Sequence, residues 1–334
     1  MVRRGRTPPV DTEMMKAAIL EAPQRFTLTE RPVPDVGCSE VRVRAAICGI
    51  CTSELDMWEG STNVPLPRFA GHEVAGVVES VGEGVTEFAI GDRVALYAEG
   101  KGFSEFSVVP AEWAVKLHDN VPFDLALGEP IACAVNGVRK ARPQLGDSVC
   151  IVGCGFMGLL MLQLFKVQGA RCIVAVDTRP NILQVARKLG ATQCLNPKES
   201  DVRAEIMRIT DDMGVDIGVE GAGIQETLDL TTQLVRMEGK LEVFGFHQGA
   251  KRLVDWGYWN WMAFEIVNGH TRTQRKYVEA MKIGLDLVAS GQLDMKTLVT
   301  HRFPIEDINL GFETAVSKPG DFIKGVVLID GNDN

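Results

Sequence analysis

A glycine-rich turn between two apolar segments sets the strongest limit on how this chain of 334 residues can fold. Val149–Val152 and Ile173–Val176 are short apolar runs, typical of strands buried on both faces of a parallel sheet. Between them lie Gly153, Gly155 and Gly158, with the spacing G-x-G-x-x-G, and then an apolar segment that favours a helix. This order of strand, turn, helix and strand predicts an α/β unit of a doubly wound sheet.

Each glycine of the turn has its own physical reason. Gly153 permits a tight turn, Gly155 lets the backbone approach a pyrophosphate, and Gly158 lets the helix pack closely on the strand. The free N–H groups and positive dipole end of the helix would then face the phosphates. Asp177 ends the second strand 24 residues after Gly153, near the ~20 residues expected for an acid that binds a ribose 2′-hydroxyl. The glycines alone would be weak evidence, but with the acid they predict a dinucleotide site.

Composition restricts the class of protein. The chain is long enough for two domains, and its 46% hydrophobic and 24% charged residues are typical of a globular protein. A net charge of −9 gives no indication of nucleic acid or anionic lipid as a partner. No apolar run reaches the ~18–20 residues of a membrane span. Eight cysteines, several in buried-strand patterns, favour a reducing cytoplasm over a disulfide framework.

The periodicity changes along the chain. Residues 1–14 are polar and are interpreted as a mobile tail or an over-called start. From Lys16 to about Leu117, short strands alternate with turn residues, which predicts a compact β-rich domain. From Asn136 to about Gly269, strands and helices alternate, which predicts a parallel sheet with helices on both faces. The strands expected in this second part are Val149–Val152, Ile173–Val176, Gln193–Leu195, Asp216–Val219 and Lys240–Phe244, with helices such as Asn181–Leu189 and Ile224–Leu234.

Three short segments of the β-rich part carry groups that suit a metal ion. They are Cys48-Gly-Ile-Cys51-Thr-Ser53-Glu54, Gly71-His72-Glu73 and Gly128-Glu129-Pro130. A thiolate, an imidazole and carboxylates suit zinc, and three protein ligands with an open position make such a site catalytic. Taken singly, Cys51 could be a buried free thiol and His72 a satisfied polar residue at a strand start. Cys48 and Cys51 have C-x-x-C spacing, but no second pair completes a four-cysteine site.

Taken together, these segments resemble the zinc-dependent medium-chain alcohol/polyol dehydrogenases from Met15 to Asp330. The matching motifs are Gly49-Ile-Cys51-Thr-Ser53-Glu54, Gly71-His72-Glu73, Gly82-Glu-Gly-Val85, Gly91-Asp92-Arg93-Val94, Glu129-Pro130-Ile-Ala and the glycine fingerprint. The resemblance implies a zinc ion held by Cys51, His72 and a carboxylate. Glu129 stands where the alcohol dehydrogenases proper have a cysteine, as in the sorbitol-like branch, and Glu73 is a competing ligand.

The resemblance also implies catalytic roles and two departures from the family. Ser53 passes the proton outward, with Glu73 beside the metal. Asp56 occupies a position where a histidine often helps this relay, so the relay is altered, or Asp56 holds a substrate hydroxyl, or it is a solvated acid. The segment 95–102 is short and has no cysteine where many relatives carry a structural zinc. We therefore expect one catalytic zinc per chain and no structural zinc.

The cofactor expected from the fingerprint and the resemblance is NAD. Asp177 favours NAD over NADP, whereas Arg179 could receive a 2′-phosphate. Lys324 matches a basic position that can meet the pyrophosphate, with a solvated lysine as the alternative. The cofactor-binding residues expected are Gly153, Gly155, Phe156, Met157, Gly158, Asp177, Arg179, Gly221, Gly245, Phe246 and Lys324.

The expected architecture is a GroES-like catalytic domain, residues 15–135 and 271–334, interrupted by a Rossmann domain over residues 136–270. The expected activity is oxidation of a secondary alcohol of a polyol, sugar or cyclitol by NAD. The alternatives are an amino-alcohol dehydrogenase, a zinc-free quinone or enone reductase, and a nucleotide sensor without activity. A homodimer or homotetramer is expected, and the aromatic segment Trp256–Trp261 is a subunit contact, a pocket wall or plain core.

Overall fold

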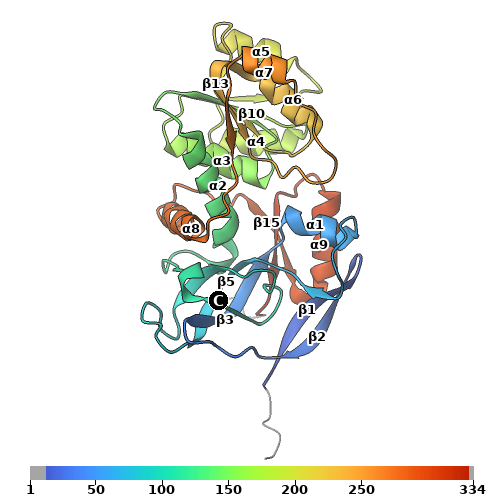
Figure 1. Cartoon of the computed structure of the whole chain (residues 1–334), viewed down its shortest axis with the longest axis vertical. Helices are drawn as coiled ribbons and strands as arrows, with labels where there is room; N and C mark the ends of the chain where they lie inside the picture. Colours follow the sequence, from blue (N-terminus) through green and yellow to red (C-terminus); the bar gives the residue numbers. More distant parts are fainter. Residues whose placement is uncertain (1–12, 331–334) are drawn as a thin grey trace, which may run out of the picture.

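The computed structural model describes residues 13–330, which form two lobes along one long axis (Figure 1). The lower lobe in the figure is rich in β-strands, and the upper lobe is a parallel sheet flanked by helices. Of the tail expected over residues 1–14, positions 1–12 lie outside the described residues. Met14 already belongs to the first strand, so the strand begins earlier than the sequence indicates.

The lower lobe contains two sheets. The larger has the strand order β15-β16-β3-β5-β6-β8, with β7 also paired to β3, and the smaller has the order β2-β1-β4. Because β16 pairs antiparallel with β3, the end of the chain returns to the N-terminal part, as expected. The strands are β1 (Met14–Ala22), β2 (Arg25–Pro32), β3 (Glu40–Gly49), β4 (Arg68–Phe69), β5 (Glu73–Val81), β6 (Arg93–Tyr97), β7 (Phe106–Pro110), β8 (Ala114–Lys116), β15 (Val299–Pro304) and β16 (Lys324–Leu328).

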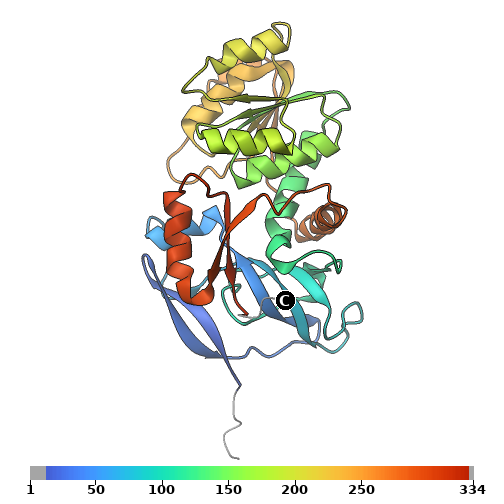
Figure 2. The ribbon, with the colours of Figure 1, turned by 180° about the vertical axis from the view of Figure 1, so that it is seen from behind.

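Two helices of the lower lobe lie side by side although they are far apart in sequence (Figures 1 and 2). They are α1 (Thr52–Glu59) and α9 (Ile308–Ser317). Trp58 of α1 and Phe312 of α9 join them, with ring centroids 5.8 Å apart. This packing fixes α1, which begins directly after Cys51, on a rigid support.

The upper lobe is the predicted doubly wound parallel sheet. Its strand order is β11-β10-β9-β12-β13-β14, so the chain reverses direction across the sheet between β9 and β12. Ligands of such sheets bind at this switch point, beyond the carboxyl ends of the strands. The elements are β9 (Ser148–Val152), α3 (Phe156–Val167), β10 (Cys172–Val176), α4 (Pro180–Leu189), β11 (Gln193–Leu195), α5 (Val202–Ile209), β12 (Val215–Glu220), α6 (Gln225–Leu234), β13 (Val235–Val243), α7 (Trp256–Trp261) and β14 (Glu265–Asn268).

The differences from the predicted elements are local. Helix α3 begins at Phe156 because Gly155 is its N-cap. Strand β13 begins at Val235, earlier than the predicted start at Lys240, since Val235 already pairs with β12. Strand β14 is an edge strand with mostly exposed side chains, so its sequence lacks the apolar run that marks the buried strands.

Two helices between the lobes connect their cores. They are α2 (Gly128–Ala141) and α8 (Gln274–Ala289). A continuous cluster of buried apolar side chains extends from Ala75 in the lower sheet, through Ile131 of α2, to Ile151 in the upper sheet. The two helices approach closely, because a β-carbon at Gly284 of α8 would overlap Ile131. Helix α2 therefore places its first turn, with Glu129, against the lower sheet.

Helix α7 excludes one alternative for the aromatic segment. Trp256 and Trp261 are 66% and 75% exposed, whereas Trp259 is buried. Plain core is therefore wrong for two of the three tryptophans. Among helices of residues 13–330, none has the length and apolar character needed to cross a membrane.

The upper sheet also contains a fully buried acid, Glu242 on β13. Its carboxyl lies against the α-carbons of Gly137 and Gly269, where a β-carbon would come within 3.2 and 2.9 Å of Oε1. Neither carboxyl oxygen has a hydrogen-bond partner within the described part of the chain. Burial raises the pKa of Glu242 well above its usual value, so folding favours the protonated acid.

Candidate active site

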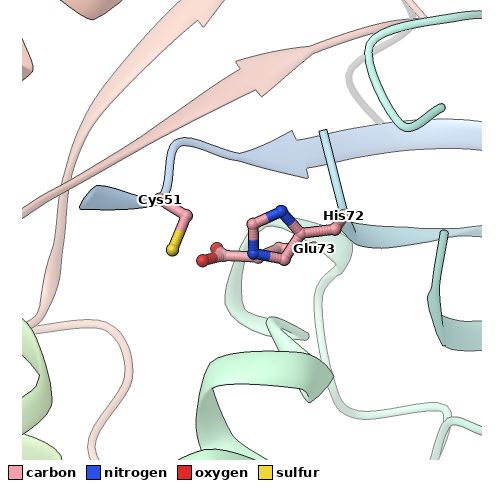
Figure 3. Close-up of side chains that lie close together, drawn as sticks. All are labelled: Cys51, His72 and Glu73. Atoms are coloured by element: carbon pink, nitrogen blue, oxygen red, sulfur yellow. The ribbon is translucent and has the colours of Figure 1, made fainter. Parts of the chain in front are cut away.

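Three potential metal ligands converge where β3 and β5 lie side by side. Gly49, the last residue of β3, pairs with Glu73, the first residue of β5. Cys51 follows two residues later and His72 precedes Glu73, so the pairing brings all three together (Figure 3). One ligand atom from each of Cys51, His72 and Glu73 lies within 4.8 Å of the others. A β-carbon at Gly49 would overlap the Glu73 carboxylate, so glycine is needed there.

Glu54 orients the imidazole of His72. Its Oε1 lies 3.2 Å from His72 Nδ1 and accepts a hydrogen bond of 2.6 Å from the backbone N–H of Gly71. The contact occupies Nδ1 and leaves Nε2 for a ligand, the usual arrangement of a metal-binding histidine. Glu54 belongs to the Cys51 motif, but the sequence analysis predicted no function for it. Its position in the first turn of α1, three residues after Cys51, is the signal that could have indicated one.

The electrostatics of the cluster suit a divalent cation. Burial would lower the pKa of His72, but the negative charges of Glu54 and Cys51 outweigh it and raise the pKa well above the usual value. Glu54, Glu73 and Glu129 are all at most 7% exposed. Such a concentration of buried negative charge needs compensation. A thiolate, an imidazole and a carboxylate form a ligand set that zinc prefers, so the residues fit this ion.

Lys324 lies among the potential metal ligands, which corrects one expectation. Its ammonium donates hydrogen bonds to Ile50 O (2.7 Å) and Glu73 Oε1 (2.8 Å) and lies 4.8 Å from the centre of the Phe156 ring. The solvated alternative is wrong, since Lys324 is 5% exposed. The ammonium is engaged by Glu73, and a contact with a pyrophosphate stays a prediction. Burial would lower the pKa of Lys324, but Glu73 and Cys51 outweigh it and raise the pKa.

Glu73 Oε2 keeps a free lone pair in spite of this ion pair. The atom lies 2.7 Å from Lys324 Nζ, but the hydrogen bond of good geometry goes to Oε1. Glu129, the other carboxylate considered, is outside the group of three. Its Oε2 is 4.0 Å from His72 Nε2, and its Oε1 accepts a hydrogen bond from Cys133 Sγ. The geometry therefore favours Glu73 as the third ligand and places Glu129 at the border of the site.

Burial raises the pKa of Glu129, although the nearby His72 opposes the shift. A carboxyl with a raised pKa is suited to exchange a proton or a hydrogen bond with a hydroxyl. Cys133 is the donor to Glu129, and burial raises the pKa of the Cys133 thiol well above its usual value. This cysteine is therefore a neutral neighbour of Glu129 rather than a thiolate ligand.

Ser53 and Asp56 differ in how closely they approach the cluster. The hydroxyl of Ser53 donates to Cys51 Sγ at 3.3 Å, so it touches a ligand atom. Asp56 lies three residues further along α1, on the same face by helical spacing, and is half-buried. Within residues 13–330, no hydrogen bond or ion pair joins its carboxylate to the cluster. The role of Asp56 stays a prediction.

Aromatic side chains stand on one side of His72, and the sequence did not indicate them. The ring of Tyr97 lies edge-on to His72, with centroids 6.1 Å apart, and contacts Trp113 and Tyr277 at 6.1 and 6.2 Å. The three are single aromatic residues far apart in the chain, so no local pattern could have joined them. They give the site an apolar wall.

The glycine fingerprint has the geometry that its spacing predicts. Gly153 has φ = +95°, in the left-handed region that favours glycine. Gly155 is the N-cap of α3, and a β-carbon there would meet only the tip of Arg179, at 4.0 Å. A β-carbon at Gly158 would overlap the backbone of Gly153. The helix end with Phe156 and the half-buried Met157 is thus open for a phosphate group.

Asp177 is held between the fingerprint and Arg179. Its Oδ2 accepts from the backbone N–H of Cys154 at 3.1 Å, and its Oδ1 accepts from Arg179 Nε at 3.2 Å. Lys318, which the sequence did not single out, is a second cation at this place. Partial desolvation of its ammonium and the charge of Arg179 lower the pKa of Lys318, while Asp177 opposes the shift. The carboxylate is therefore fixed but partly neutralised.

Two loops border the carboxyl ends of β12 and β13. The backbone N–H of Gly221 donates to Val152 O at 2.8 Å, so the loop after β12 lies against the end of β9. The N–H of Gly245 donates to Glu220 O at 2.8 Å, and Phe246 then turns outward with 47% exposure. These residues lie at the edge of the sheet where the switch point predicts a ligand.

Comparisons with known proteins agree with this arrangement. Residues 37–119 match the family described as "Alcohol dehydrogenase GroES-like domain", and residues 157–259 match "Zinc-binding dehydrogenase". The chain is 28% identical to sorbitol dehydrogenase of Bacillus subtilis, over 94% of this chain and 97% of that one. It is 32% identical to L-threonine 3-dehydrogenase of Pyrococcus furiosus, over 83% and 87%.

A solved structure extends the likeness to the whole fold. An oxidoreductase/dehydrogenase of unknown specificity from Escherichia coli superposes with a TM-score of 0.87 and 28% identity. The match covers 95% of this chain and all of that one. These matches agree with the two lobes of the structure, one GroES-like and one of the Rossmann type. They also agree with the convergence of Cys51, His72 and Glu73. The chain belongs to the zinc-dependent medium-chain dehydrogenase family, with the alcohol and polyol dehydrogenases.

Proposed function

We propose that this chain is a zinc- and NAD-dependent dehydrogenase that oxidises a secondary alcohol of a polyol, sugar or cyclitol to the ketone. The observation that carries the proposal is the convergence of Cys51, His72 and Glu73 within 4.8 Å. The cation–π contact between Lys324 and Phe156 places this cluster next to the start of the fingerprint helix. A metal at the cluster and a nucleotide at the helix would thus share one site.

The residues of the cluster and their neighbours would have different functions in the reaction. Cys51, His72 and Glu73 would hold zinc, which supplies a Lewis acid that favours the deprotonated form of an alcohol. The nicotinamide accepts the hydride, which is chemistry of the cofactor. Glu54 keeps Nε2 of His72 directed at the cluster. The hydroxyl of Ser53, hydrogen-bonded to Cys51 Sγ, is placed to carry the alcohol proton outward.

A polyol is favoured over an amino acid as the substrate. Glu129 has a raised pKa and borders the site, so it can hold a second hydroxyl of the substrate. Among the residues that contact the cluster in the described chain, Lys324 is the cation available to an α-carboxylate, and Glu73 already engages it. The aromatic wall at Tyr97 suits the C–H face of a sugar or cyclitol. The relative acting on threonine keeps the amino-alcohol alternative open.

The test is elemental analysis followed by a substrate screen. We expect one zinc per chain, because segment 95–102 has no cysteine for a structural site. We expect reduction of NAD with polyols or cyclitols and weaker turnover with amino alcohols. Two zinc ions per chain, or none after expression with zinc, would contradict the metal proposal. Turnover of quinones or enones alone would favour the zinc-free reductase, and nucleotide binding without any turnover would favour a sensor.

NAD is proposed over NADP because Asp177 accepts a ribose hydroxyl and repels a 2′-phosphate. Repulsion of like charges in a partly buried cleft costs several kcal/mol, on the order of a hundredfold in discrimination. Arg179 and Lys318 reduce this repulsion and are the residues that would serve NADP. The ratio of kcat/KM for the two cofactors decides between them, and a preference for NADP would refute the reading of Asp177.

We also propose a homodimer or homotetramer. Trp256 and Trp261 of α7 are largely exposed, and Ile266 on the edge strand β14 is 43% exposed. Exposed apolar side chains of this size, beside a strand edge to which no other strand of residues 13–330 pairs, favour contact with a second copy. Sedimentation of a monomer at micromolar concentration would contradict this proposal.

A further inference from the structure

A buried carboxylate at the end of β12 ties several backbone groups together. The side chain of Glu220 is fully buried. Its Oε1 accepts hydrogen bonds from the backbone N–H groups of Ala222 (2.9 Å) and Gly223 (2.7 Å), and from the hydroxyl of Thr227 (2.6 Å). Its Oε2 lies 2.7 Å from Nε2 of His247, which comes from the next loop. The carboxylate therefore joins the loop after β12 to the loop after β13.

The other side of the imidazole ring identifies its protonation state. Nε of Arg252 donates to Nδ1 of His247 at 3.1 Å, so Nδ1 must be the acceptor. Nε2 then carries the proton and donates it to Glu220. Arg252 also donates through Nη2 to the carbonyl groups of Gly223 (2.8 Å) and Gln248 (3.3 Å). A neutral imidazole thus bridges a buried anion and a cation, and the cation contacts both loops.

These loops form the rim of the nucleotide site. A β-carbon on Gly153, the first fingerprint glycine, would lie 2.9 Å from Ala222 in the first loop. A β-carbon on Gly223 would lie 2.7 Å from the carbonyl oxygen of Phe246 in the second loop. The ring of Phe246 in turn packs edge-on against His270, with centroids 6.0 Å apart. Movement of either loop would therefore displace the rim next to the fingerprint.

We propose that His247 is a positioning residue for the nicotinamide cofactor, acting through Glu220 and Arg252 to hold loops 221–224 and 245–252 in their binding geometry. The inference rests on the proposed use of a nicotinamide nucleotide. Loops that are ordered before binding lose less conformational freedom when the ligand arrives, so the bridge raises affinity without touching the ligand. Removal of the imidazole would leave one oxygen of a buried carboxylate without a donor and release the link to Arg252.

The test compares His247→Ala with His247→Gln in the full chain. Calorimetry measures the Kd for NAD⁺ and for NADP⁺, and amide hydrogen exchange of the nucleotide-free protein measures the order of both loops. We expect His247→Ala to weaken binding about tenfold, as for the loss of one such contact, and to accelerate exchange at Ala222 and Gly223. His247→Gln keeps an N–H donor for Glu220, so it should restore most of the affinity.

His118→Ala is the matched control, because His118 forms an equally short contact with Asp286 (2.7 Å) on the exposed surface. It should leave binding and loop exchange unchanged. Equal affinity of His247→Ala and the unmutated protein would overturn the inference, even if exchange accelerated. If the unmutated protein bound neither nucleotide, the proposed function itself would be refuted, and this inference with it.

Discussion

Replacing Lys324 with methionine should destabilise the metal-free protein strongly and the zinc-loaded protein much less. The Lys324 and Glu73 side chains are 6% and 0% exposed and 2.7 Å apart. Removal of one partner of a buried ion pair costs roughly 3–5 kcal/mol, because the remaining charge is uncompensated. Methionine keeps most of the aliphatic stem against Phe156, so the change removes mainly the charge and the hydrogen bonds.

The part of this cost that comes from the uncompensated charge of Glu73 has an upper limit, to which the loss of the Lys324 hydrogen bonds adds. If the variant cannot hold the carboxylate, Glu73 takes up a proton instead. At pH 7, protonation of a carboxyl with an ordinary pKa of about 4.3 costs about 3.7 kcal/mol, at 1.36 kcal/mol per pH unit. A neutral carboxyl group needs no counter-ion, so the deficit in stability should be smaller in acid than at neutral pH. The deficit should shrink by about 1.4 kcal/mol for each unit below pH 7.

Urea unfolding with a chelator and with saturating zinc measures the two deficits. Zinc brings positive charge to the same carboxylate, so it should restore most of the lost free energy of unfolding in Lys324→Met. The control is Lys116→Met, since Lys116 pairs with Asp92 at the same 2.7 Å, but with side chains 53% and 25% exposed. That pair should contribute at most about 1 kcal/mol, independent of zinc. A metal-free Lys324→Met protein as stable as the unmutated one, or equal deficits with and without zinc, would refute the reasoning.

Four further substitutions test other features of the molecule. Cys51→Ser and His72→Ala should each lose zinc and activity while the circular dichroism of the fold persists; full activity in either variant would show that the site assignment is wrong. Asp177→Ala should weaken NAD use and raise kcat/KM with NADP, because a repelling carboxylate is removed and Arg179 is released; an unchanged ratio of the two cofactors would contradict this. The free energy of unfolding of Glu242→Gln, relative to that of the unmutated protein, should rise by about 1.4 kcal/mol per pH unit above about pH 5. The reason is that the acid ionises in the unfolded chain, whereas its raised pKa keeps it protonated in the folded protein. A difference that does not vary with pH would exclude a protonated Glu242.

The features that the sequence revealed are those encoded over short distances. The strand, turn and helix around Gly153 follow from local apolar runs and glycines, and the parallel sheet follows from repetition of that pattern. The resemblance supplied Cys51, His72 and the two candidate carboxylates, but the pairing of β3 with β5 was needed to favour Glu73 over Glu129. The start of β5 lies next to the end of β3 only in the tertiary structure, so the sequence alone does not show it.

Contacts between distant positions could not be predicted. Lys324 and Glu73 are 251 residues apart, and a lysine in an apolar strand has no local feature that identifies its partner. Tyr97 and Tyr277 are 180 residues apart in the sequence and meet beside His72. The bridge from Glu220 to His247 depends on two neighbouring parallel strands ending at the same edge of the sheet. In each case the tertiary arrangement of strands and helices, rather than the periodicity, decides which side chains meet.

The buried acids of this chain show why the metal cluster is the place where a cation can bind. A buried carboxylate needs hydrogen-bond donors, a counter-ion or a proton. Glu220 is satisfied by backbone and side-chain donors on both oxygens, and Glu242 has no partner and favours the protonated form. Only Glu73, of these three, is balanced by an ammonium group, that of Lys324. A second cation can therefore share Glu73 without breaking a backbone contact, and the neighbouring Cys51 and His72 supply the remaining ligands for it.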